Sequence, residues 1–186
     1  MKRIGAEAGD DLVQLIRAES VNPPGNETRA AKVVIDLLRR EGLEPEFFEP
    51  IPDRGNVSVR LRGSASAANP NLDARDPKDG ALLLFAHLDV VPANQDGWTV
   101  NPFEGVVKDG YVWGRGAVDM KDGDGMILAM ARSWARNGVQ PDRTIVRRPH
   151  DRLQSHLPPR RLRTRGRARR HDCQCRFLFR PAHNRA

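Results

Sequence analysis

The segment ALLLFAHLDVVPANQDGWTVNPFEGVVKDGYVWGRGAVDMKDGDG, residues 81–125, carries the clearest structural pattern of this chain and holds its candidate site. Residues 81–86 form a short apolar run, which predicts a strand buried on both faces at the centre of a mixed or parallel sheet. His87 and Asp89 follow at positions i and i+2, so their side chains leave the strand end on the same side. Because open α/β sheets bind ligands at this edge, the pattern indicates a site there.

The second half of the stretch places an aspartate before an expected helix. Gly114 and Gly116 suit a backbone that passes close to another group, and Asp119 comes just before the helix expected from residue 122. A histidine and an aspartate at two separate loop ends are typical ligands for zinc. A His-x-Asp pair is also common by chance, so the motif alone leaves open both a metal site and an ordinary turn. An EF-hand calcium loop is excluded, because Ile127 stands where that loop requires glycine.

The flanking sequence predicts an α/β fold. Helices are expected from apolar periodicity at residues 6–20, 26–41 and 122–137, with Asn26 as the N-cap of the second. Strands are expected at residues 45–49, 56–61 and 141–146, and a hairpin joining residues 105–107 to 111–113 through the turn KDG. The polar stretch between residues 63 and 80 is typical of a surface loop.

Length and composition are those of a soluble globular chain with one core. The sequence has 186 residues, 39% of them hydrophobic, and 16 glycines. It holds no apolar run long enough to span a membrane, and residues 1–20 show no secretory signal, so we expect a cytoplasmic protein without a membrane partner. Cys173 and Cys175 are too close in sequence for a structural disulfide, so nothing requires an oxidising compartment.

Taken together, four motifs resemble those of a known enzyme family. HLDVVP, NPF after Trp98, the KDG turn and WGRGAVDMKDG are similar to the co-catalytic zinc metallopeptidase family of acetylornithine deacetylase, succinyl-diaminopimelate desuccinylase, aminoacylase and glutamate carboxypeptidase. The likeness covers residues 10–146 and includes the loop SVNPPGNE. It implies the N-terminal portion of a three-layer α/β catalytic domain, with a mixed, mostly parallel sheet.

The resemblance also implies roles for three residues. His87 would be a terminal metal ligand, Asp119 would bridge two metal ions, and Asp89, the residue with an implied catalytic role, would orient the His87 imidazole. In the family two zinc ions, for which cobalt can substitute, activate a water that attacks an amide carbonyl. The implied substrates are N-acyl amino acids or short peptides, and relatives are often homodimers. The resemblance further implies a cis peptide bond between Asp119 and Met120.

The composition changes abruptly at Arg147. Residues 1–146 carry a net charge of −4, whereas residues 147–186 carry +11, from 13 arginines and 2 aspartates. Residues 147–186 contain no Val, Ile, Glu or Lys, but they hold both cysteines and four of the five histidines. The change falls inside an expected strand, where no domain ends. We therefore divide the chain into residues 1–146, the N-terminal part of a catalytic domain, and an aberrant Arg-rich tail, residues 147–186.

Three interpretations of the tail are open. Out-of-frame translation of a GC-rich gene, which we favour, explains the abundance of Arg and Pro and the lack of Ile and Lys, and it predicts a disordered tail. The alternative is a non-catalytic domain with a basic nucleic-acid-binding tail, because this charge is ample for neutralising phosphates. A zinc cluster is the third interpretation, and its spacing is weak. Its members would be His171, Cys173, Cys175 and His183.

The tail stands where the family carries further parts of its site. There a strand end delivers two adjacent glutamates, a general base and a metal ligand, whereas the last glutamate of this chain is Glu104. Of the family's ligands the sequence offers His87 and Asp119. We therefore expect a truncated, inactive fragment without a nucleic-acid partner, which binds zinc weakly or not at all.

Overall fold

The computed structural model describes residues 2–64, 81–147 and 176–178, and the structural statements below concern these residues. Most of the expected loop at residues 63–80 lies outside the described residues. Most of the tail, with both cysteines, also lies outside them, and so does the prediction that the tail is disordered. The helices are α1 (Lys2–Arg17), α2 (Thr28–Arg39) and α4 (Lys121–Arg136). The strands are β1 (Glu46–Phe48), β2 (Asn56–Leu61), β3 (Leu82–Leu84), β4 (Val106–Lys108), β5 (Tyr111–Trp113), β6 (Ile145–Arg147) and β7 (Arg176–Leu178).

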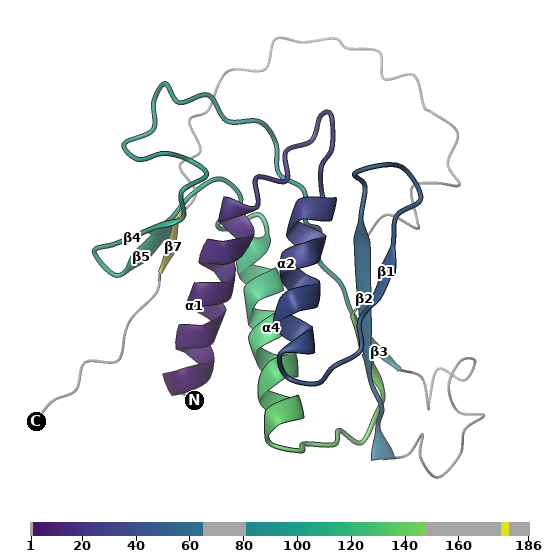
Figure 1. The fold of residues 1–186 in the computed structure, drawn as a ribbon. Helices are drawn as coiled ribbons and strands as arrows, with labels where there is room; N and C mark the ends of the chain where they lie inside the picture. The colour runs from purple at the N-terminus through teal and green to yellow at the C-terminus, as the bar shows by residue number, and fades with distance from the viewer. Residues whose placement is uncertain (1, 65–80, 148–175, 179–186) are drawn as a thin grey trace, which may run out of the picture.

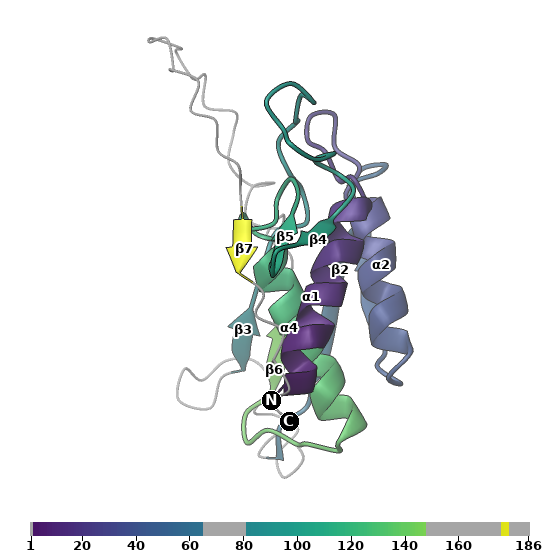
Figure 2. The same ribbon diagram turned by 90° about the vertical axis from the view of Figure 1, so that its left-hand side faces the viewer.

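The main sheet has the strand order β1-β2-β6-β3, and in Figure 1 it stands to the right of the three helices. β1 pairs with β2 and β2 with β6 in antiparallel orientation, whereas β3 runs parallel to β6. Figures 1 and 2 together show that α1, α2 and α4 all lie on one face of this sheet. The expected α/β fold with a mixed sheet is confirmed, although only one of its three described pairings is parallel.

A hairpin and one further strand form a second, smaller sheet with the order β4-β5-β7. Its turn residues, Asp109 and Gly110, both have positive φ angles, of 55° and 78°. This is the geometry of a two-residue hairpin turn that Asp-Gly favours. The hairpin predicted from the sequence is therefore confirmed. β7 adds to its other edge, antiparallel to β5.

The prediction that residues 81–86 form a central strand buried on both faces is wrong for the described residues. β3 spans only Leu82–Leu84 and lies at the edge of the sheet, where it pairs with β6 alone. Leu82, Leu83 and Phe85 remain 50%, 51% and 53% exposed, and since Leu82 and Leu83 point to opposite faces of the strand, neither face is fully buried. An apolar run indicates that its side chains are apolar, but it does not indicate which neighbouring element packs against them. It therefore cannot distinguish a central strand from an edge strand.

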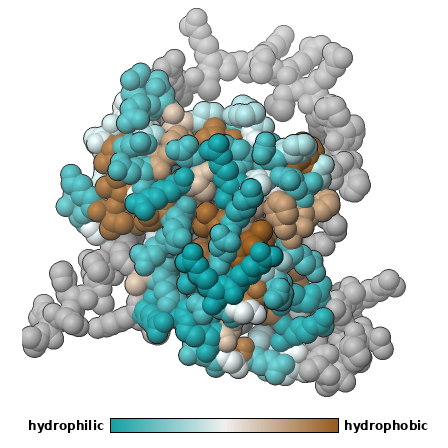
Figure 3. All heavy atoms as spheres, in the orientation of Figure 1, coloured by the Kyte–Doolittle hydropathy of each residue, from teal (hydrophilic) through white to brown (hydrophobic). Residues whose placement is uncertain are grey.

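The helices pack their apolar faces against one another and against β2. The core cluster includes Leu15, Val34, Leu38 and Leu128 from the helices and Val57 from the strand, all at most 1% exposed. Figure 3, seen from the same direction as Figure 1, shows mostly hydrophilic side chains over the helices, with hydrophobic ones between them. The helical periodicity of the sequence is thus confirmed. The expected N-cap is wrong, since Glu27 and not Asn26 precedes α2, without a side-chain cap bond.

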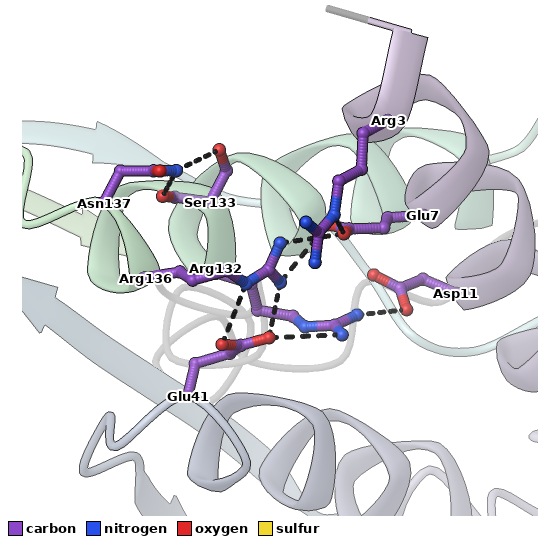
Figure 4. Close-up of polar contacts among 8 residues, drawn as sticks. All are labelled: Arg3, Glu7, Asp11, Glu41, Arg132, Ser133, Arg136 and Asn137. Carbon is purple, nitrogen blue, oxygen red and sulfur yellow. Dashed lines mark hydrogen bonds and ion pairs between the residues drawn. The ribbon is translucent and has the colours of Figure 1, made fainter.

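A cluster of ion pairs joins the three helices at one end of the layer (Figure 4). Arg132 of α4 donates to Asp11 of α1 over 2.6 Å, and Asp11 is only 1% exposed. Arg136 of α4 contacts Glu7 of α1 at 2.8 Å and Glu41, just after α2, at 2.5 Å. The hydrogen bond from Arg136 lowers the pKa of Glu41. The cluster therefore fixes how the helices sit relative to one another.

We predict that Arg132→Ala destabilises the chain by about 3–5 kcal/mol, because it leaves the Asp11 carboxylate buried without its partner. Arg3→Ala is the matched control, since the Arg3 side chain is 76% exposed and its ion pair with Glu7 contributes about 1 kcal/mol at most. Urea unfolding followed by circular dichroism measures both. Equal losses of unfolding free energy in the two variants would contradict a large contribution of the buried ion pair to stability.

Two glycines of α4 provide a second test of the packing. A Cβ on Gly125 would lie 2.7 Å from the carbonyl oxygen of Ala8, so α1 and α4 touch backbone to backbone there. A Cβ on Gly123 would meet only the terminal carbon of Met120, at 3.2 Å. We predict that Gly125→Ala lowers the free energy of unfolding, whereas Gly123→Ala raises it by up to about 1 kcal/mol through helix propensity. Thermal unfolding of both variants checks this, and a gain for Gly125→Ala would contradict it.

Candidate metal centre

The segment that follows β3 presents His87 and Asp89 on one side. Ala86, Leu88 and Val90 alternate with them and are 1%, 3% and 4% exposed, so they anchor the segment in the core. This alternation of buried and open positions is that of an extended chain. His87 and Asp89 are therefore held on the outer side of a segment whose own position is fixed by packing.

The residues after α1 hold this segment from its other side. The Val90 amide donates to the carbonyl of Ser20 and the Asn22 amide donates to the carbonyl of Val90, each over 2.9 Å. Val21 and Val90 form a parallel bridge. The turn that ends the first helix thus serves as a short strand beside the site.

The loop before α4 brings Asp119 to the same place. Gly116 has a φ of +80°, and a Cβ there would lie 2.4 Å from a methyl carbon of Val90, so only glycine permits this approach. The Lys121 amide donates to the Gly116 carbonyl over 2.9 Å, which closes the loop onto the helix. The Asp119–Met120 peptide bond is cis, as the sequence resemblance predicts.

The three residues predicted for the site lie together. His87 Nε2 is 3.1 Å from Asp119 Oδ1, and His87 Nδ1 is 3.1 Å from Asp89 Oδ1. The imidazole is therefore held between two carboxylates, one at each ring nitrogen. The Asp119 side chain is 83% exposed, so its carboxylate is open to solvent.

The two carboxylates set the charge of the imidazole. The hydrogen bond with Asp89, aided by the contact with Asp119, raises the pKa of His87 to about 9, although burial opposes the shift. The same bond with His87 holds the pKa of Asp89 far below its ordinary value, and Asn22 contributes in the same direction. At neutral pH both ring nitrogens of His87 therefore carry protons, and one donates to each carboxylate.

We predict that, in the presence of a chelator, His87 titrates near pH 9 and that Asp89→Asn brings its pKa back toward 6.5. Since the folded pKa is raised, this interaction stabilises the fold fully below pH 6.5, and the contribution is lost as the pH rises through about 9. NMR of the ring protons measures the titration, and comparison with His87→Ala assigns the signal. Asp96→Asn is the control, and a pKa near 6.5 in the unaltered chain would overturn the geometry.

The donors present fit part of a metal site. His87 Nε2 and Asp119 Oδ1 are the nitrogen and oxygen donors that zinc accepts, and their separation of 3.1 Å is close to the roughly 3.3 Å expected between two ligands of a tetrahedral zinc ion. Catalytic zinc sites use three protein ligands. Within residues 2–64, 81–147 and 176–178, no group of three or more His, Cys, Asp or Glu side chains is placed to hold a metal ion.

Two residues that the sequence analysis did not single out support the site. The fully buried Lys121 donates from Nζ to the carbonyl of Leu88 over 2.9 Å and to the Ser20 hydroxyl over 2.7 Å. Asn22 donates from Nδ2 to Asp89 Oδ2 over 2.9 Å. In the sequence, these two residues were marked only by their positions. Lys121 stands two residues after Asp119, and Asn22 lies in the loop SVNPPGNE.

Comparison with known proteins finds a family to which part of the chain is similar. Residues 83–147 match the model of the peptidase family M20/M25/M40. The chain resembles this family, as its motifs predict. The matched stretch contains His87, Asp89 and Asp119. The interpretation as a non-catalytic domain with a nucleic-acid-binding tail is not favoured by these matches, and the tail itself lies mostly outside the described residues.

The relatives match about two thirds of the chain. Succinyl-diaminopimelate desuccinylase from Methylobacterium radiotolerans is 42% identical over 120 residues, which are 62% of this chain and 26% of that protein. The desuccinylase from a Bradyrhizobium species is 37% identical over 137 residues, or 70% of this chain and 32% of that protein. The chain therefore spans about a quarter to a third of the length of the relatives it matches.

Solved structures confirm the fold. Human carnosine dipeptidase 1 superimposes with a TM-score of 0.59 at 22% identity, covering 82% of this chain and 33% of that one. The M20 family metallo-carboxypeptidase Sso-CP2 from Sulfolobus solfataricus gives a TM-score of 0.58 at 19% identity, with coverages of 77% and 30%. In the described part of this chain, no helix is long and apolar enough to cross a membrane.

Proposed function

We propose that this chain carries one half of a metal centre for the hydrolysis of amide bonds in N-acyl amino acids or short peptides. The observation that carries the proposal is the convergence of His87 Nε2 and Asp119 Oδ1 at 3.1 Å, with Asp89 behind the imidazole. The match to a peptidase family and the desuccinylases among the relatives support the class of reaction. We also propose that the protein is located in the cytoplasm.

The contacts of the three residues support the roles proposed for them. Asp89 accepts the Nδ1 proton of His87, so the ring can present its Nε2 lone pair to a metal once the second proton is lost. Asp119 offers an exposed carboxylate beside that lone pair. His87 and Asp119 would thus hold the ion, and Asp89 would fix the orientation of the ring. Zinc, or cobalt in its place, would act as a Lewis acid toward the amide carbonyl.

We further propose that the chain by itself does not catalyse the reaction. A catalytic zinc site needs three protein ligands, and among the described residues no group of three or more His, Cys, Asp or Glu side chains is placed to hold a metal ion. The relatives are three to four times as long as the stretches they share with this chain. The division at residue 146 and the out-of-frame origin of the tail stay predictions from the sequence, and homodimer formation stays what the family resemblance implies for intact relatives.

A chimera tests the proposed half-site. The corresponding N-terminal segment of the desuccinylase from Methylobacterium radiotolerans is replaced by residues 1–147 of this chain, and the release of succinate from an N-succinyl amino acid is measured. We expect chelator-sensitive activity in the chimera and none in this chain alone. His87→Ala or Asp119→Ala should remove the activity of the chimera, because each deletes a ligand.

Asp96→Ala in the chimera is the matched control, since Asp96 is an exposed aspartate of the same segment that contacts Asn94. It should leave succinate release unchanged. A folded chimera whose activity survives His87→Ala would contradict the proposed role of this pair. Chelator-sensitive hydrolysis by this chain alone would instead show that its tail supplies ligands and a base.

A further inference from the structure

A line of polar contacts runs from the interior of the fold to the candidate metal centre. Glu27, just before α2, is paired with Arg54, whose Nε lies 3.0 Å from Glu27 Oε2. Arg54 also donates from Nη1 to Asn22 Oδ1 over 3.2 Å. Asn22 in turn donates from Nδ2 to Asp89 Oδ2 over 2.9 Å. The other oxygen of Asp89 contacts His87, so four contacts connect Glu27 with the imidazole.

The inner end of this line is fixed by burial and close packing. The Glu27 side chain is 4% exposed and that of Arg54 is 26% exposed. A Cβ on Gly25 would lie 2.4 Å from Arg54 Nη1, so the guanidinium rests directly on the backbone of this glycine. The turn before α2 is also tied to the Arg54 loop, because the Thr28 amide donates to the carbonyl of Asp53 over 3.0 Å. Arg54 therefore has little room to move.

The amide of Asn22 can face only one way between these neighbours. Arg54 is a donor without an acceptor, and the ionised Asp89 carboxylate is an acceptor without a donor. Only with Oδ1 toward Arg54 and Nδ2 toward Asp89 are both contacts satisfied. The fixed guanidinium thus fixes the amide, and the amide fixes the rotation of the Asp89 carboxylate. That rotation decides whether Asp89 Oδ1 meets His87 Nδ1.

We propose that Asn22 and Arg54 are positioning residues of the metal centre. They hold Asp89 so that it sets the orientation of the His87 ring, although neither residue approaches the metal ligands directly. This inference rests on the proposed function, because the orientation of His87 matters for a metal only if His87 binds one. Partners of this kind, behind a histidine ligand, typically change metal affinity about 10- to 100-fold.

Two readouts on the full chain test the inference. The first, taken with a chelator present, is the NMR signal of the His87 Nδ1 proton, which is visible only while its bond to Asp89 shields it from exchange with water. The second is the zinc affinity from calorimetry. Only the zinc binding that is lost in His87→Ala is counted. Asn22→Asp, which keeps the shape but turns the donor into an acceptor, should abolish the proton signal and weaken that zinc affinity about 10- to 100-fold. Arg54→Met should act in the same direction.

Asn94→Ala is the matched control, since Asn94 is an exposed asparagine that donates to Asp96 over 3.0 Å. It should leave both readouts unchanged, and thermal unfolding verifies that every variant is folded. An unchanged Nδ1 signal in folded Asn22→Asp and Arg54→Met overturns the inference. Loss of that signal, in a chain whose zinc binding does not depend on His87, supports the positioning of the ring but refutes the proposed function.

Discussion

The buried ammonium of Lys121 is the contact on which assembly of the candidate site depends. Its acceptors are the carbonyl of Leu88, between His87 and Asp89, and the hydroxyl of Ser20, in the turn after α1. Lys121 itself begins α4, directly after the loop of Asp119. A buried cation is tolerated only with hydrogen bonds and balancing charge. Burial lowers its pKa to about 8, and three carboxylates oppose that shift: Asp124, Asp89 and Glu27.

The site thus inherits its geometry from the packing of the helices. α4 is held against α1 by the close contact at Gly125 and by the ion pair of Arg132 with Asp11. Because Lys121 begins this helix and Asp119 stands two residues before it, the placement of α4 also determines where the Asp119 carboxylate stands relative to the strand end. A change at the far end of α4 can therefore reach His87 without any contact to it.

The sequence predicted those features that local patterns encode. Periodicity located the helices, the Asp109-Gly110 pair located the hairpin, and the spacing of His87 and Asp89 placed both on one side of the strand end. The bonds of Lys121 to Ser20 and of Asn22 to Asp89 join residues 101 and 67 positions apart, so no local pattern announces them. The edge position of β3 was not predicted for a related reason, because it depends on which strands pair with β3.

The register of the main sheet has a consequence for the chain during its synthesis. Ile145 of β6 is the pairing partner of both Leu61 of β2 and Leu82 of β3, and β6 is the last strand of this sheet to be made. Until it leaves the ribosome, β2 and β3 have no strand between them, and their unpaired edges can template pairing with another chain. Among the described strands of the main sheet, the one made last is thus the one that joins β3 to the rest, and the facing edges of β2 and β3 stay open until it has been synthesised.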